Sequence, residues 1–234
     1  MTTTPRSPRF SQATLAFLRA LERHNDREWF RARKDVYQAD VRGPMVAVVE
    51  RLARDLPRFA PDLVASPKLS IYRPYRDTRF SEDQRPIKTN ISALFPVRGR
   101  AKHDGAGLYL EVSPKHVLIA GGLYAPQPPD LHRLREHLAA NHRRFGALVE
   151  SPSFTRAFGG LQGDTLVRVP RGFPADHPAA EYLKRKQFLM GREFPAAFAT
   201  SPRFYTTLVR LFERMAPVVR FLNEPLLAAA IVVF

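Results

Sequence analysis

The chain has 234 residues, of which 44% are hydrophobic and 11% aromatic, so it can bury a sizeable core and lies outside the disordered class. It has no cysteine, which excludes disulfides, thiolate metal sites, a cysteine nucleophile and iron–sulfur chemistry. The formal net charge is +15, with 30 arginines against 7 lysines; GC-rich codon usage also produces this ratio, so charge alone does not establish a nucleic-acid partner.

The first quarter of the chain has the apolar spacing of three helices. Ser11 can cap the first and Asp26 the second, and the third opens after Gly43 with Pro44 in its first turn. Residues 1–10 are expected to be a flexible N-terminus. Residues 11–234 are expected to form a single domain, because no linker, internal repeat or low-complexity block interrupts them.

After residue 57 the hydrophobic period shortens from about 3.6 to about 2, which indicates strands. Strands are predicted at residues 69–73, 88–95, 107–113 and 116–123, and a further one near 165–169. The third and fourth form a predicted hairpin that turns at Pro114-Lys115. This turn would place Glu111 opposite Leu118 and Tyr109 opposite Ala120.

Helices return in the second half. One begins at Asp130 and turns a basic surface outward, and a long final helix carries an apolar stripe over residues 204–222, with Pro217 as a site for a kink. The fold class is therefore α+β: N-terminal helices, a mainly antiparallel sheet of about four to six strands, and a long C-terminal helix packing on it. The basic residues expected to point outward are Arg133, Arg135, His137, Arg143 and Arg144.

The apolar run over residues 225–234 is too short to cross a bilayer, and the N-terminus lacks the apolar run of a signal peptide. We therefore expect a cytoplasmic location and no membrane partner.

The chemistry concentrates in residues 73–90, where basic and acidic side chains join two predicted strands. Guanidinium groups match phosphate and carboxylate with paired donors, so the stretch predicts an anion site. Strand alternation sends Lys88, Asn90 and Ser92 to one face, and Tyr109 would join them if the hairpin faces the same way. The alternative is that Asp77 and its arginines pair to brace a long loop. The predicted ligand-binding residues are Arg73, Arg76, Arg79, Lys88, Asn90 and Tyr109.

Three carboxylates are candidates for acid–base catalysis, namely Asp77, Asp83 and Glu111, although no spacing fixes a pair and an enzymatic role is left open. Phosphate-loop, dinucleotide, nucleophile-elbow and zinc-helix motifs are absent from the sequence. The seven histidines have no metal-ligand spacing. We expect neither a metal nor a cofactor.

Several motifs in order resemble one family: R-x-Y-R-D-T-R-F-S-x-D, P-x-K-T-N, G-L-Y-L-E-V-S-P and G-G-L-Y-x-P. With N-D-R-E-W-F near the start and P-V-V-R-F-L-N near the end, the chain resembles the conserved-hypothetical family called domain of unknown function 2461. The resemblance implies one full-length domain but no known reaction. The sequence departs from the family pattern at Gln84, Ile87 and Glu111, the last of which is often histidine in similar sequences. The motif positions are Arg73, Arg76, Asp77, Arg79, Phe80, Ser81, Asp83, Lys88, Thr89, Asn90, Gly121 and Gly122.

Three functions remain open at this point. The leading one is binding of an anionic small molecule or phosphate ester, with Asp77 orienting the arginines. The second is nucleic-acid binding through the basic helix and the arginine-rich stretch. The third is a structural or partner-binding module that uses the apolar tail at residues 226–234.

Overall fold

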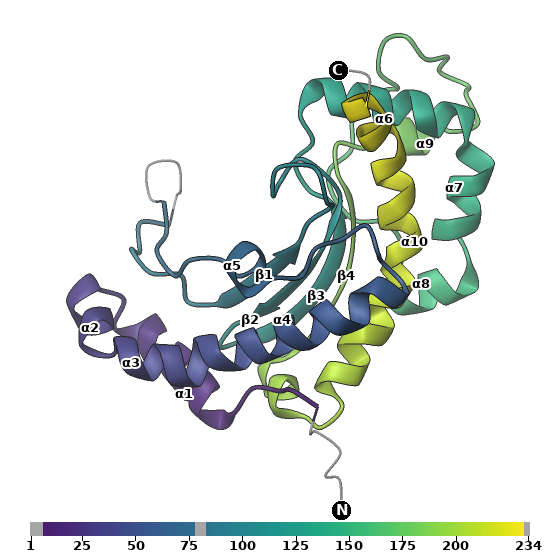
Figure 1. Cartoon of the computed structure of the whole chain (residues 1–234). Coiled ribbons are helices and arrows are strands. Elements are labelled where there is room, and N and C mark those ends of the chain that lie inside the picture. The colour runs from purple at the N-terminus through teal and green to yellow at the C-terminus, as the bar shows by residue number, and fades with distance from the viewer. Residues whose placement is uncertain (1–6, 78–82, 232–234) are drawn as a thin grey trace, which may run out of the picture.

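The computed structural model describes residues 7–77 and 83–231, with side chains as far as residue 228. Four antiparallel strands form one sheet in the order β1–β2–β3–β4. N-terminal helices lie beside this sheet and the long helix α10 (Phe204–Ile231) packs on it (Figure 1). The predicted α+β class is confirmed. The strands are β1 (Ile91–Phe95), β2 (Gly107–Val112), β3 (His116–Leu123) and β4 (Phe188–Pro195).

The predicted caps begin the first two helices. The Ser11 side chain accepts a hydrogen bond from the Thr14 amide at the start of α1 (Gln12–Arg23), and the Asp26 carboxylate accepts one from the Trp29 amide at the start of α2 (Arg27–Ala32). After α3 (Lys34–Tyr37), a π-helical turn over Gln38–Arg42 leads into α4 (Gly43–Asp55). The second and third predicted helices are thus joined by helical backbone rather than by a loop.

Pro44 explains a buried hydroxyl next to this π-helical turn. Proline has no N–H, so it cannot donate to the carbonyl of Asp40 four residues earlier. The Oγ1 of Thr14, on α1, donates to that carbonyl at 2.5 Å, and Thr14 is fully buried. The bond satisfies both groups and ties α1 to the turn.

The sheet has one covered face and one open face. Alternation turns Ile91, Ala93 and Phe95 of β1 into the core, together with their neighbours on β2 and β3. Helix α10 covers this side against β2 and β3, with Phe212 edge-on to Phe95 at a ring-centre distance of 5.7 Å, while α4 contacts β1. The side chains at the alternate positions face the other side, where the candidate site lies.

The predicted hairpin is confirmed in its register. Glu111 pairs with Leu118 and Tyr109 with Ala120. In the turn, the Ser113 hydroxyl accepts hydrogen bonds from the backbone amides of Lys115 and His116. Upstream of the first helix, Phe10 is buried edge-on to Phe204, so core packing begins before the boundary expected at residue 11.

Two of the predicted strands are wrong. Residues 67–70 form the short helix α5 (Pro67–Ser70), since Pro67 favours a first helical turn, and only Ile71 bridges to β1. Residues 165–169 make a single bridge, from Thr165 to Arg185. The fourth strand of the sheet is instead β4, which the sequence reading did not predict. The remaining helices are α6 (Pro128–Ala140), α7 (His142–Val149), α8 (Pro152–Phe158) and α9 (Ala180–Leu183), and single 3₁₀ turns lie at Leu56–Arg58 and Ala196–Thr200.

The basic surface predicted on α6 is partly turned inward. The Arg135 guanidinium donates to the carbonyls of Leu183 and Arg185, and His137 packs its ring on Phe221 of α10. Packing against α9 and α10 therefore removes two of the five side chains expected in solvent. Helix α10 itself runs through Pro217 without interruption, and among the described residues no helix is long and apolar enough to cross a membrane.

Candidate functional site

A cavity of about 600 Å³ lies on the open face of the sheet, a volume that suits a small-molecule ligand. Its polar lining comes from Arg76, Lys88, Asn90, Ser92, His103, Tyr109, Glu111 and Gln162. Its apolar, aromatic and small lining comes from Tyr72, Leu94, Gly107, Leu118, Ala120, Gly121, Gly122, Tyr124, Leu189 and Met190. All four strands contribute to it.

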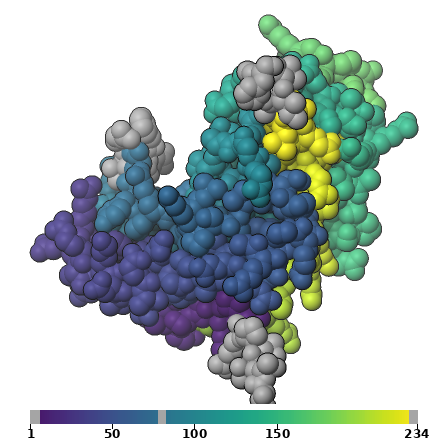
Figure 2. Space-filling view, in the orientation of Figure 1, coloured from purple at the N-terminus to yellow at the C-terminus, as the bar shows by residue number. Residues whose placement is uncertain are grey.

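One wall of the cavity belongs to an irregular hairpin, residues 71–77 and 83–90, which we call the arm. Its two sides are joined by backbone hydrogen bonds: Lys88 N–H to the Pro74 carbonyl at 2.8 Å and Arg76 N–H to the Pro86 carbonyl at 2.9 Å. In the space-filling view the surface is hollowed between the arm and the part of the molecule formed by later residues (Figure 2). The arm thus places Arg76 and Lys88 on the side of the cavity facing the sheet.

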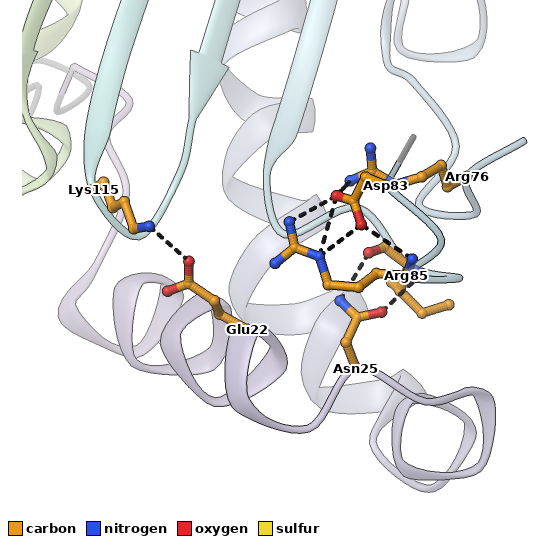
Figure 3. Close-up of polar contacts among 7 residues, drawn as sticks. Glu22, Asn25, Arg76, Asp83, Arg85 and Lys115 are labelled. Atoms are coloured by element: carbon orange, nitrogen blue, oxygen red, sulfur yellow. Dashed lines mark hydrogen bonds and ion pairs between the residues drawn. The ribbon is translucent and has the colours of Figure 1, made fainter. Parts of the chain in front are cut away.

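Contacts with the N-terminal helices hold the arm in place. The Asn25 side chain donates to the Ile87 carbonyl at 2.9 Å and accepts from the Ile87 amide at 3.0 Å, as one strand residue would pair with another (Figure 3). Tyr75 packs edge-on to Phe30 at 5.8 Å. The arm is therefore anchored by specific contacts with the segment at 25–30, which carries the N-D-R-E-W-F motif.

Asp83 links two arginines of the arm. Its carboxylate accepts paired hydrogen bonds from the Arg85 guanidinium, the shortest 2.7 Å, and lies 3.0 Å from Arg76 Nη2 (Figure 3). The hydrogen bonds from Arg85, with the charge of Arg76, hold the pKa of the Asp83 carboxyl well below its usual range. Asp83 therefore stays ionised at neutral pH and orients Arg76.

A cluster of cations surrounds Tyr72 at the arm side of the cavity. Lys102 Nζ lies 3.8 Å and Lys88 Nζ 4.9 Å from the centre of the Tyr72 ring, on which His103 is stacked. Burial and the charges of Arg76 and Arg73 lower the pKa of Lys88. Burial and the charge of Lys88 lower the pKa of Lys102 to about 8. The positive charges are crowded together and partly desolvated, so a bound anion would relieve their repulsion.

On the sheet, Tyr109, Glu111 and His116 form a hydrogen-bonded chain. The Tyr109 hydroxyl donates to Glu111 Oε2 at 2.6 Å, and His116 Nε2 lies 3.1 Å from Glu111 Oε1. Burial, and then the charge of Glu111, raises the pKa of Tyr109 far above its usual value, so the phenol stays protonated. The chain reaches from the hairpin turn to the cavity floor and has the geometry of an acid–base relay.

Two buried polar atoms beside the cavity have no hydrogen-bond partner in the described part of the chain. They are Nε of Arg76, a donor, and Oδ1 of Asn90, an acceptor. Buried polar atoms are usually paired, because an unpaired one loses its hydration without compensation. A ligand offering both an acceptor and a donor would satisfy both atoms.

The predicted site residues divide into two groups. Five line the cavity together: Arg76, Lys88, Asn90, Tyr109 and Glu111. Arg73 and Asp77 are exposed outside its lining, and Asp83 acts from behind Arg76. Arg79 lies outside the described residues.

Sequence reasoning missed Tyr72, Lys102 and His103. Lys102 and His103 lie in the loop between β1 and β2 and reach Tyr72 only through the fold. One signal was available: lysine is rare in this arginine-rich chain, and a GC-rich base composition explains a lysine less well than it explains an arginine.

The fold and the site define an α+β protein with a mixed-charge cavity on the open face of its sheet. A family model described as conserved hypothetical protein (DUF2461) matches residues 13–221. The chain belongs to this family, as its motifs indicated. The comparison with curated proteins gives no match.

Proposed function

We propose that the cavity binds an anionic small molecule, a phosphate ester or a carboxylate. The observation that carries this proposal is the surplus of cations around it: Arg76 and Lys88 line the cavity, Lys102 lies beside it over the ring of Tyr72, and Glu111 is the one carboxylate in the described lining. Neither lysine has a carboxylate within salt-bridge distance among the described residues. Arg76 offers an unpaired donor.

The competing account of the arm is structural, since Asp83 pairs with Arg76 and Arg85. This pairing engages one end of the Arg76 guanidinium and leaves Nε without a partner. It does not involve Lys88 or Lys102. Loop bracing therefore accounts for Asp83 and Arg85, and an anion accounts for the remaining cations.

The test is a thermal-shift and calorimetric screen of phosphate esters and carboxylates against the wild type and an Arg76→Ala, Lys88→Ala double variant. A ligand that binds only the folded protein raises its Tm by a few degrees at about 100 times its Kd. We expect such shifts for the wild type and their loss in the double variant.

A matched control removes the same two charges elsewhere, through Arg203→Ala and Lys186→Ala, both exposed positions outside the cavity lining. It should bind anions as the wild type does. Equal shifts in all three proteins would refute the site, because binding would then follow net charge and not the cavity.

A catalytic role has one specific observation in its favour, the Tyr109–Glu111–His116 chain. If the bound anion is a substrate, Glu111 is the carboxylate we expect to move a proton, with His116 exchanging it with solvent. Glu111→Gln should then abolish turnover and leave anion affinity within about twofold. A lost affinity with unchanged turnover would contradict this role.

A further inference from the structure

The lining of the cavity changes character along the strands. Because paired residues lie side by side across a sheet, the floor consists of rows, each crossing neighbouring strands. The row nearest the β2–β3 turn is polar, and the rows beyond it become small and apolar. In order they are Ser92–Glu111–Leu118, Leu94–Tyr109–Ala120 and Gly107–Gly122–Leu189.

The cations lie at the polar end. Lys88 and Asn90 precede Ser92 on the same side of the chain, and Arg76 reaches the cavity from the arm. At about 3.3 Å per residue, the third row lies about 13 Å from the first. An inorganic ion bound at Lys88 would leave the apolar end of the cavity, at the third row, unfilled.

At the apolar end of the cavity, the lining residues have small or apolar side chains. Gly107, Ala120 and Gly122, which carry no side chain beyond Cβ, line the cavity there. Leu189 stands at the edge of this floor, and Tyr124, which is 70% exposed, stands at the rim. Such a surface favours a flat apolar group, because binding that group removes apolar area of both the ligand and the protein from water.

We infer that the ligand of this cavity is an organic anion with a flat apolar body, of the size of a naphthyl group. Its phosphate or carboxylate head contacts Arg76 and Lys88, and its body lies over Ala120 and Gly122 towards Tyr124. A protonated or hydroxyl-bearing head also supplies the donor that Asn90 Oδ1 lacks. This inference rests on the proposed anion site and specifies its ligand class.

The test measures Kd by calorimetry for inorganic phosphate, phenyl phosphate and 2-naphthyl phosphate, with acetate and 2-naphthoate as the carboxylate arm. We expect affinity to rise at least about tenfold from inorganic phosphate to 2-naphthyl phosphate, since the added rings bury apolar area. The carboxylate pair shows whether the head is recognised as a phosphate or as an anion generally.

Ala120→Leu places a branched side chain on the floor and should weaken 2-naphthyl phosphate about tenfold or more while leaving inorganic phosphate unchanged. Ala147→Leu, the same change at an exposed position of α7, is the matched control. If Ala120→Leu does not fold, Leu94→Trp narrows the same end of the cavity from β1.

The outcomes separate the inference from the proposed function. Equal affinity for inorganic and naphthyl phosphate, lost in the Arg76→Ala, Lys88→Ala variant, would overturn the ligand class and keep the anion site. Naphthyl phosphate binding that Ala120→Leu does not weaken would overturn the placement of the body. Failure of every anion to bind would overturn the proposed function itself.

Discussion

Lys102 lies beside the cavity, over the ring of Tyr72, and its pKa is lowered into the range of ordinary buffers. Its ammonium donates to the Ser70 carbonyl at 2.8 Å and lies over Tyr72, with Lys88, His103 and Asp104 as the charged or titratable neighbours. Burial and Lys88 lower its pKa to about 8. Lys102 is therefore largely protonated at pH 7 and neutral at pH 9.

This pKa predicts a pH-dependent affinity. A folded-state pKa lowered from 10.5 to about 8 means that the folded protein releases this proton earlier than the unfolded chain. A bound anion favours the charged form, so above pH 8 binding must take up a proton, and affinity should fall by up to about tenfold per pH unit. Titration with an arylsulfonate, whose charge is constant from pH 7 to 9, measures this.

Lys102→Arg is the matched variant, because arginine keeps its charge throughout this range. It should bind with a flatter pH profile, and any residual slope belongs to Lys88, whose pKa is also lowered. Identical profiles for the wild type and Lys102→Arg would exclude Lys102 from the site.

At the residue scale the sequence predicted what alternation controls. Lys88, Asn90 and Ser92 line one cavity with Tyr109 and Glu111, the arrangement expected if the hairpin faced the same way, although strand β1 begins only at Ile91 and Lys88 and Asn90 belong to the arm. The sequence did not predict which side chains in the arm contact one another after folding. Asp83 pairs with Arg76 because the two sides of the arm fold back on each other.

Two asparagine side chains each form hydrogen bonds with both backbone groups of a residue distant in the sequence. Asn25 pairs with both backbone groups of Ile87 in the arm, and Asn223 of α10 pairs with both backbone groups of Ala106, just before β2, at 2.9 Å each. Asn223 is 2% exposed, whereas Asn25 is half-buried. The first bond pair anchors the arm and the second anchors the long helix to the sheet.

Replacing each asparagine by leucine should distinguish an effect on anion binding from an effect on global stability. Asn223→Leu leaves two buried backbone groups unpaired and should lower the free energy of unfolding by about 1–3 kcal/mol in urea titration. Asn25→Leu should cost less global stability, speed hydrogen exchange at the Ile87 amide and weaken anion binding, because the arm carries Arg76 and Lys88. Each variant is the control for the other, and equal effects on stability and binding would contradict the division.

At the element scale, prediction succeeded where periodicity and turn chemistry agreed. The β2–β3 hairpin has strict alternation and a Ser-Pro turn, and its register is correct. Strand β4 was missed because Gly191, Arg192 and Glu193 interrupt its alternation; its place in the sheet comes from pairing with β3. Residues 69–73 alternate but follow Pro67, which starts a helix.

The close pairing of β3 with β4 also explains a family motif. Gly122 has a φ of +123°, and an added Cβ would lie 1.9 Å from the Phe188 carbonyl oxygen. Only glycine fits this conformation at this distance. The second glycine of G-G-L-Y-x-P therefore has a structural role in the pairing of β3 with β4.

At the scale of the whole molecule, the charge of +15 is partly committed to internal contacts. On the basic helices α6 and α7, Arg133 pairs with Asp130 at 3.1 Å, Arg144 pairs with Glu224, and Arg135 donates to backbone carbonyls. These contacts leave fewer cations for a polyanion than the sequence indicated. The cluster at Lys88 and Lys102 differs, because no carboxylate in the described residues pairs with either.

Binding to duplex DNA should therefore depend on total charge and not on the arm. Each phosphate contact contributes about −0.9 to the slope of log K against log salt, so two variants that each lose two cations from a non-specific contact should change the slope by a similar amount. We expect Arg76→Ala, Lys88→Ala and the control Arg203→Ala, Lys186→Ala to weaken DNA binding equally, in filter-binding titrations from 50 to 200 mM salt. Only the first should lose small-anion binding. A DNA defect confined to the arm variant would make nucleic acid the ligand of the arm, and the organic anion would then be a fragment of it.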